Sequence, residues 1–326
     1  MANPILVEVT RAALVESVHR GSIAIADAAG TIRFTLGDVE TPVYTRSALK
    51  PIQALVLIES GAADAFGLSD EEVALACASH SGEPMHTSRV AAWLSRIGCS
   101  ESDLACGPQP PRYEPALEEM LRLGEKPTRL HNNCSGKHTG FLTVVRHWGI
   151  ATAGYERFEH PVQQAVAKAL RDLSGVKEFA HGVDGCAAPN FALPLAGFAR
   201  ALAQLAGWRT VGASRITRAM IAHPQLVAGT GRTCSALMRA AKGRAAVKVG
   251  AEGVYAAIIP ESGLGVALKI DDGAGRAAET AIAAVLTKLG ILDDSANEYV
   301  VSPVLNTRGA IVGERRPAPA LAQAVL

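Results

Sequence analysis

Residues 254–270 read Val254-Tyr-Ala-Ala-Ile-Ile-Pro-Glu-Ser-Gly-Leu-Gly-Val-Ala-Leu-Lys-Ile270. Two apolar segments, 254–259 and 264–270, flank a short turn that contains proline and glycine, and this pattern predicts a β-hairpin. A similar pattern occurs near the start of the chain, where 22–27 and 31–36 flank Ala28-Ala-Gly30. Hairpins at both ends predict one antiparallel sheet assembled from the two ends of the chain.

Between the hairpins, apolar residues recur at three- and four-residue spacing, which predicts helices. The expected helices are Ala48–Ile58, Thr87–Ile97, Pro115–Leu123, His138–Trp148, Pro161–Leu173 and Phe191–Leu205. The expected fold class is therefore α+β, with strands in about 4–36 and 247–302 forming the sheet and about 47–243 mainly helical. Without a low-complexity linker or a repeat of fixed period, residues 1–326 are expected to form a single unit. The tail from Arg315 to Leu321 is expected to be a loosely held end.

The composition excludes several classes of protein. Lys and Arg total 32 against 31 Asp and Glu, so the net charge of +1 gives no reason to expect a nucleic-acid partner. The uncharged run Gly185–Ala199 contains two prolines and is too short for a membrane helix. The N-terminus has no basic segment before its apolar residues, so we expect a cytoplasmic protein. The six scattered cysteines are expected to be reduced thiols.

Ser47-Ala-Leu-Lys50 stands where a helix is expected to begin, since residues 51–58 continue with helical spacing. The three-residue offset places both side chains on one helical face. A desolvated lysine there can act as a base toward the serine hydroxyl, and backbone N–H groups at a helix start can stabilise an oxyanion. The alternative is an N-cap serine followed by a solvated lysine.

Two further elements contain serine or lysine. Ser79-His-Ser81 is expected in a loop that presents hydroxyls, or alternatively in a capping turn for the next helix. Lys248-Val-Gly250 precedes a predicted strand, where glycine allows close approach to the backbone; the alternative is a solvated lysine at a strand edge. The order Ser-x-x-Lys, Ser-x-Ser, Lys-x-Gly is close to that of serine β-lactamases and penicillin-binding proteins, with Ser81 in place of an asparagine.

Additional segments make the sequence similar to the Rhizobium-type L-asparaginase family, which resembles serine β-lactamases and glutaminases in fold. The matching segments extend from about residue 7 to about residue 290 and are Glu16-Ser-Val-His-Arg20, Arg46-Ser-Ala-Leu-Lys-Pro51, Cys77-Ala-Ser-His-Ser81, Asn133-Cys-Ser-Gly-Lys-His138, Asp184-Gly-Cys186, His223-Pro-Gln-Leu-Val-Ala-Gly229 and Lys248-Val-Gly-Ala251. The resemblance implies a β-lactamase/glutaminase-like single catalytic unit, a homodimer, and hydrolysis of L-asparagine to L-aspartate and ammonia.

The resemblance also implies two catalytic serine–lysine pairs, Ser47 with Lys50 and Ser79 with Lys248. In this interpretation Ser47 attacks the side-chain amide carbon while Lys50 takes its proton, and water then hydrolyses the aspartyl ester. Ser79 and Lys248 relay protons or tune the nucleophile. Either serine could serve as the nucleophile, and Ser47 is favoured because its helix start supplies both a base and oxyanion donors.

The same resemblance implies a zinc ion held by Cys134, Lys137 and Cys186, which orients the substrate rather than activating water. From the residues alone, the two cysteines are better interpreted as buried thiols, because the paired spacing of structural zinc motifs is missing. Arg46, His138 and Asp184 are the expected substrate-binding residues, with Arg46 making a bidentate contact to the α-carboxylate.

Three rival interpretations remain open. Asp272-Gly-Ala-Gly275-Arg-Ala-Ala278 superficially fits a dinucleotide fingerprint, but too few residues follow it for repeated βαβ units. A β-lactamase-like or glutaminase-type serine hydrolase shares the catalytic order, and one methylene of pocket depth separates asparagine from glutamine. A catalytically inactive amino-acid-binding protein is the alternative outside enzymes, and it predicts binding of asparagine without release of ammonia.

Overall fold

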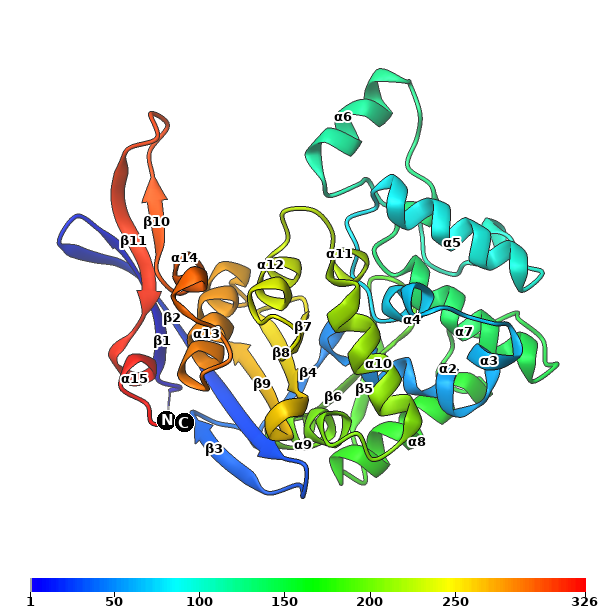
Figure 1. The fold of residues 1–326 in the computed structure, drawn as a ribbon, viewed down its shortest axis with the longest axis horizontal. Coiled ribbons are helices and arrows are strands. Elements are labelled where there is room, and N and C mark those ends of the chain that lie inside the picture. The colour runs from blue at the N-terminus through cyan, green and yellow to red at the C-terminus, as the bar shows by residue number, and fades with distance from the viewer. Residues whose placement is uncertain (1) are drawn as a thin grey trace. The chain divides into compact units, whose positions relative to one another are not determined.

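The structure is a computed structural model that describes residues 2–326. Its described residues form two compact units, coloured along the chain in Figure 1. The sheet unit contains the chain up to Ala48 together with Leu193–Gly207 and Leu237–Leu326. The helical unit contains Leu49–Ala192 and Trp208–Ala236. That residues 1–326 act as a single catalytic unit stays a prediction.

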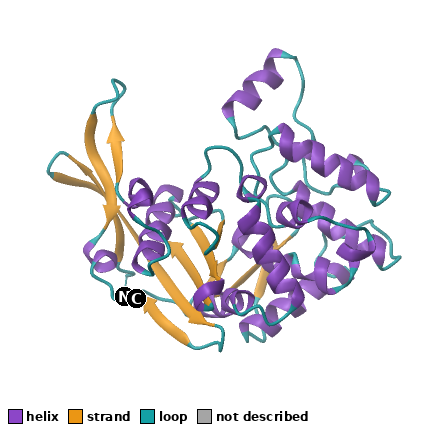
Figure 2. Ribbon diagram, in the orientation of Figure 1, coloured by secondary structure: helices purple, strands orange, loops and turns teal. Residues whose placement is uncertain are grey.

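The sheet unit is built on an eight-stranded sheet whose pairs are antiparallel (Figure 2). Along the sheet the strands follow the order β10-β11-β1-β2-β9-β8-β7, and β3 also pairs with β2. The bounds of these strands are β1 (Ile5–Arg11), β2 (Leu14–Asp27), β3 (Ile32–Leu36), β7 (Ala246–Val249), β8 (Val254–Ile259), β9 (Leu264–Ile270), β10 (Ser302–Leu305) and β11 (Ile311–Pro317). The other elements of this unit are β4 (Pro42–Tyr44), η1 (Arg46–Leu49), η4 (Pro260–Ser262), η5 (Asp294–Ala296), α9 (Leu195–Ala206), α13 (Gly275–Lys288), α14 (Asn297–Val300) and α15 (Pro319–Ala322).

Both predicted hairpins are present, as β2–β3 and as β8–β9. The hairpin near the start also pairs with the one near the end, because β2 runs antiparallel to β9 from Gly21↔Ile270 to Asp27↔Leu264. The predicted α+β fold, with an antiparallel sheet built from both chain ends, is therefore confirmed. Because α13 follows the antiparallel strand β9, the Asp272–Ala278 segment is not part of a parallel βαβ unit.

Helix α9 packs directly on β9. A Cβ atom added at Gly265 would lie 2.2 Å from the backbone nitrogen of Ala203 and 2.5 Å from the carbonyl oxygen of Ala199. Glycine is therefore required at this position for the helix to approach the strand. The predicted helix Phe191–Leu205 begins later than expected, because its first residues belong to strand β6 (Pro189–Pro194). The small apolar residues of that strand are buried, and their pattern does not distinguish a strand from a helix.

The prediction of a loosely held C-terminal tail is wrong. Arg315, Arg316 and Pro317 are the last residues of β11, which pairs with β1 through Val9↔Arg315 and Val7↔Pro317. The prolines that suggested a loop stand at the end of this strand and at the start of α15, two positions where a missing N–H is tolerated. The sheet thus extends beyond the expected limit at residue 302.

The helical unit has many short helices around one long buried helix, α7. Its elements, two of which continue past the boundary of the unit, are α1 (Lys50–Gln53), α2 (Leu55–Glu59), α3 (Ala62–Ala65), α4 (Asp70–Ala76), α5 (Pro84–Arg96), η2 (Glu101–Asp103), α6 (Glu114–Arg122), η3 (Arg129–His131), α7 (Ser135–His147), α8 (Pro161–Ser174), β5 (Ala180–Val183), β6, α10 (Val211–Ala222), α11 (Pro224–Val227) and α12 (Thr233–Ala240). Helix α7 is buried without interruption from Ser135 to Val145, so its polar side chains must find partners inside the protein.

No helix within residues 2–326 is long and apolar enough to cross a membrane.

Candidate functional site

A buried lysine and a serine form the first pair of interest in the helical unit. Lys50, the first residue of α1, is 1% exposed, and its Nζ atom donates to the Oγ atom of Ser79 at 3.0 Å. The same ammonium also donates to the carbonyl oxygens of Ala78 and Asn133. Ser79 itself is fixed by a hydrogen bond from its N–H to the carbonyl oxygen of Val227 at 2.9 Å. The arrangement holds an amine beside a hydroxyl at a distance suited to proton exchange.

Two thiols and a second lysine meet at the start of α7. The Nζ atom of Lys137 lies 2.9 Å from the Sγ atom of Cys186. A hydrogen bond from the buried thiol of Cys134, together with the charge of Lys137, lowers the pKa of Cys186 to about 4 despite its burial. The same hydrogen bond and burial raise the pKa of Cys134 to about 12. The lowered pKa of Cys186 favours its thiolate, which is the form that binds metals and attacks electrophiles.

His138 follows Lys137 in α7 and is completely buried. Its Nδ1 atom lies 2.7 Å from the hydroxyl of Tyr155, which in turn accepts a hydrogen bond from the N–H of Ala105 at 2.9 Å. Its Nε2 atom has no hydrogen-bond partner among the described residues. Burial, with a smaller contribution from the charge of Lys137, lowers the pKa of His138 to about 3, so the ring is neutral.

The Ser79–Glu83 loop is anchored to the segment Gly229–Arg232. Ser81 donates its hydroxyl to the carbonyl oxygen of Ala228 at 2.9 Å, and Glu83 accepts from both the N–H and the hydroxyl of Thr230. A Cβ at Gly229 would lie 2.3 Å from the Ser81 Oγ, and its φ of 124° belongs to the left-handed region. Glycine is required at position 229 because the two loops are in direct contact.

Two buried histidines pack beneath this loop. The rings of His80 and His86 are stacked, with centroids 4.8 Å apart. Burial, reinforced by the nearby charge of His86, holds the pKa of His80 well below its usual value. The Nε2 atom of His80 lies 2.9 Å from the hydroxyl of Ser135, which donates to the carbonyl oxygen of Leu130. The loop therefore rests on neutral, fully hydrogen-bonded groups.

In the sheet unit, Lys248 lies within strand β7, where it is opposite Ala256 and 2% exposed. The alternative of a solvated lysine at a strand edge is therefore wrong for this residue. Its Nζ atom donates to the carbonyl oxygen of Val249 at 2.8 Å. A Cβ at Gly250 would lie 3.0 Å from the carbonyl oxygen of Thr45, so the end of β7 contacts the chain just before Ser47.

Arg46 and Ser47 are in η1, which continues without a break into α1. Arg46 has a φ of 49°, an uncommon value for a residue with a side chain, and strain of this kind is concentrated at functional sites. Its guanidinium is 4.0 Å from the exposed carboxylate of Glu252 and about a quarter exposed, so the ion pair is weak. Ser47 is half-buried.

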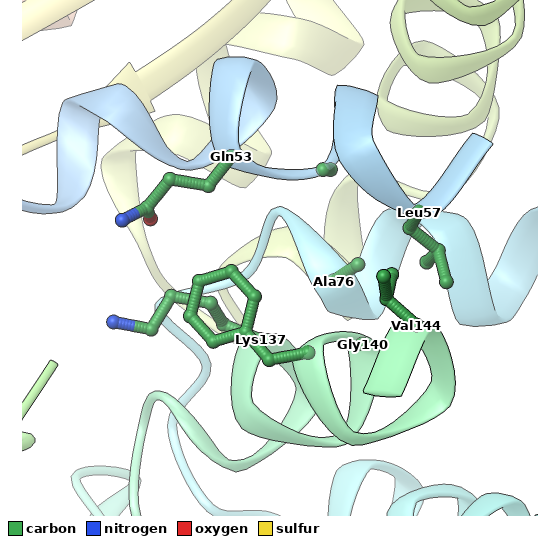
Figure 3. A pocket seen from close by; sticks show the side chains of 8 residues that line it. Gln53, Leu57, Ala76, Lys137, Gly140 and Val144 are labelled. Atoms are coloured by element: carbon green, nitrogen blue, oxygen red, sulfur yellow. The ribbon is translucent and has the colours of Figure 1, made fainter. Parts of the chain in front are cut away.

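A small cavity lies in the helical unit beside Lys137 (Figure 3). Its volume is about 10 Å³, and apolar side chains such as Leu57 and Val144 form one wall. Figure 3 shows the polar ends of Gln53 and Lys137 extending to the same side, away from this wall. The cavity has room for about one water molecule and is too small for an amino acid.

The family model described as L-asparaginase II matches residues 7–317. The chain belongs to this family. It is therefore an enzyme, an L-asparaginase, as the sequence motifs predicted. A search of curated proteins gave no match.

Solved structures similar to this asparaginase include a β-lactamase and a penicillin-binding protein homologue. A β-lactamase from Mycobacterium bovis is 16% identical, with a TM-score of 0.42 over 82% of this chain and 94% of the other. The octameric penicillin-binding protein homologue from Pyrococcus abyssi is 13% identical, with a TM-score of 0.37 over 83% and 73%. The assignment to the family rests on the sequence match alone.

Several predicted site residues of the asparaginase come together within one unit. In the helical unit, Lys50 meets Ser79, and Lys137 meets Cys186. Asp184 belongs to the tight turn that carries Cys186, where its carboxylate accepts the N–H of Gly185 at 2.8 Å. The pairing of Ser79 with Lys248, and the roles of Arg46, Ser47 and His138, stay predictions.

Three residues that complete this geometry were not singled out from the sequence. Tyr155 orients His138, Glu83 anchors the Gly229–Arg232 segment, and Asn133 supplies a carbonyl oxygen to Lys50. Tyr155 stands in a segment without apolar periodicity, so no local pattern marks it. Glu83 could have been noted as the residue just before a helix that begins with proline, where an acidic side chain is favoured.

Proposed function

We propose that the chain hydrolyses L-asparagine to L-aspartate and ammonia through an acyl-enzyme on Ser47. The observation that carries the proposal is the buried amine of Lys50, 3.0 Å from Ser79 and three residues after Ser47 in one continuous helical segment. A base hydrogen-bonded to one serine and three residues after another in the sequence matches the requirement of nucleophilic catalysis for an activated hydroxyl. Membership of the L-asparaginase II family supports asparagine as the substrate.

In the proposed reaction, the Oγ atom of Ser47 attacks the side-chain amide carbon and Lys50 accepts its proton. The C–N bond then breaks, the nitrogen takes up a proton, and ammonia leaves. Water adds to the resulting aspartyl ester and gives its proton back through the same groups, which frees Ser47 and L-aspartate. Ser79 passes protons to and from Lys50, with which it is already hydrogen-bonded. Lys248, another buried amine, is proposed to take part in the same relay.

Three residues are proposed to bind the amino-acid part of the substrate. Arg46 pairs with the α-carboxylate, since its contact with Glu252 is weak enough to be exchanged for a bidentate one. Asp184 pairs with the α-ammonium group. His138 supplies a hydrogen bond from inside the helical unit.

We propose that Cys134, Lys137 and Cys186 bind zinc. The donor set fits a zinc ion in kind, because it offers two sulfurs and one nitrogen, and the lowered pKa of Cys186 favours the thiolate form. Among residues 2–326 no cluster of three or more His, Cys, Asp or Glu side chains is arranged for a metal, so Lys137 is needed as the third donor. Burial lowers the pKa of Lys137, but the thiols of Cys186 and Cys134 raise it by more. Lys137 must lose its proton before its nitrogen can bind zinc. When bound, zinc would orient the substrate by attracting one of its polar groups.

Metal content tests the zinc proposal independently of activity. Purified protein is expected to contain about one zinc per chain by elemental analysis, while Cys186→Ser loses most of it. Cys234→Ser is the matched control, since Cys234 is another buried thiol of the helical unit outside the cluster. Equal zinc in all three proteins, or none in the wild type, would contradict the assignment.

Release of ammonia from L-asparagine and L-glutamine tests the reaction, with and without a chelator. Asparagine-selective release is expected, and it should vanish in Ser47→Ala and nearly vanish in Lys50→Met. Full turnover in Ser47→Ala would move the nucleophile to Ser79. Release from glutamine, hydrolysis of nitrocefin, or binding of asparagine without turnover would favour a glutaminase, a β-lactamase or a binding protein, respectively.

A homodimer in the cytoplasm completes the proposal. The described cysteines are all free, which agrees with a reducing compartment. In the sheet unit, exposed apolar side chains occur on the hairpins β1–β2 and β10–β11, among them Leu14 at 76% and Ile311 at 72%. Such side chains favour a contact with a second copy. Light scattering is expected to give twice the mass of one chain. The double variant Leu14→Ser and Ile311→Ser should reduce the measured mass to that of a single chain.

A further inference from the structure

The hydrogen bonds around Tyr155 determine which nitrogen of His138 carries the proton. The Tyr155 hydroxyl has one hydrogen to donate, and its side chain is buried. The N–H of Ala105 can only donate, so at this contact the Tyr155 oxygen is the acceptor. The remaining contact of the hydroxyl among the described residues is the Nδ1 atom of His138, at 2.7 Å.

A proton on Nδ1 of His138 would leave the Tyr155 hydrogen without an acceptor in a buried environment, which is costly. The hydroxyl therefore donates to Nδ1, and the ring proton is on Nε2. That Nε2–H group is buried and has no partner among the described residues. A histidine binds a metal only through a nitrogen that carries no proton, and in this tautomer that nitrogen, Nδ1, already accepts from Tyr155.

We propose that Tyr155 is a positioning residue that holds His138 as the Nε2–H tautomer, so that His138 donates a hydrogen bond to an oxygen atom of the amino-acid substrate. His138 directly follows Lys137 in α7, and Lys137 contacts Cys186, so the ring belongs to the segment that carries the proposed zinc ligands. Beside two lysines, the unpaired N–H donor favours a carboxylate or an amide carbonyl over a cationic group. The role in substrate binding rests on the proposed function, whereas the tautomer does not.

Nuclear magnetic resonance of protein labelled with ¹⁵N in histidine tests the tautomer directly. His138→Gln identifies the His138 signals by their disappearance. In the wild type, the Nε2 resonance is expected to have the shift of a protonated nitrogen and Nδ1 that of an unprotonated one. A proton on Nδ1 overturns the proposal, whether or not the protein hydrolyses asparagine. If the protein has the expected tautomer but no asparaginase activity, the tautomer assignment stands and the proposed function is contradicted.

Kinetics of Tyr155→Phe test the consequence for the substrate. Removal of one hydrogen bond that fixes the donor is expected to lower kcat/KM for L-asparagine roughly tenfold, mainly through KM. Thr143→Val is the matched control, because it removes another buried hydroxyl hydrogen bond, to Thr139 in the same helix. Unchanged KM in Tyr155→Phe, or an equal rise in both variants, overturns the positioning role. If Tyr155→Phe does not fold, the wild-type spectrum still decides the tautomer.

Discussion

Ser79 and Ser81 are two residues apart and both buried, yet their hydroxyls have different partners. The Ser79 Oγ accepts from Lys50, whereas Ser81 donates to the backbone carbonyl of Ala228. The first contact involves a group that can exchange a proton, and the second is a structural contact between loops.

Ser79→Ala is therefore expected to reduce kcat for ammonia release by roughly 10²–10⁴, because it removes one member of the proton relay. Ser81→Ala is expected to leave kcat within a few-fold and to lower the free energy of unfolding by about 1 kcal/mol. Steady-state kinetics and urea unfolding of both variants check this. A large loss of kcat in Ser81→Ala, or none in Ser79→Ala, would reverse the assignment.

For single residues, the sequence identified side chains that can take part in catalysis or binding, but it did not identify their partners in the fold. The contact of Lys50 with Ser79 brings together a helix start and a loop residue separated by 29 positions, which depends on tertiary packing. Lys248 has the same sequence context as a solvated strand-edge lysine, and only the packing of the folded unit buries it. Nothing local marks Tyr155 as the partner of His138.

Among the elements, the contact between α9 and β9 places the strictest demand on one residue. Gly265→Ala would force the added methyl group into the backbone of α9, where no side chain can move aside. We expect a loss of about 3 kcal/mol in the free energy of unfolding, measured by urea denaturation. Gly275→Ala is the control, because a Cβ at the start of α13 meets no atom within 4 Å. A similar loss in both variants would show that close packing is not the cause.

The elements themselves were predicted well where periodicity is strong, as in α5, α6, α7 and α8 and in both hairpins. The errors occur where composition is ambiguous. In 191–194, small apolar residues and proline form a buried strand, although they continue the apolar pattern of the helix that follows. In 311–317, charged residues form an inner strand, because their partners on β1 include the oppositely charged Glu8, which contacts Arg316.

For the molecule as a whole, buried histidines link stability to pH. Burial lowers the pKa of both His80 and His86 in the folded state, so the unfolded chain binds more protons below the ordinary pKa of 6.5. Stability is therefore complete above about pH 6.5 and declines as the pH falls from there toward the folded-state values.

We expect the Tm at pH 5 to be several degrees lower than at pH 7.5, as measured by circular dichroism. His86→Asn should reduce this difference, since asparagine does not titrate. His160→Asn is the control, because His160 is a partly exposed histidine outside the stacked pair. Identical Tm values at both pH values would contradict the linkage.

The sheet built from both chain ends has a consequence for translation. Strands β1 and β2 are synthesised well before their partners β11 and β9. Until then β1 and β3 can pair with β2 from the same chain, but the edge of β1 that later pairs with β11 and the edge of β2 that later pairs with β9 can associate with neighbouring nascent chains. Expression yield should therefore depend on chaperones that shield the first strands for most of the translation time.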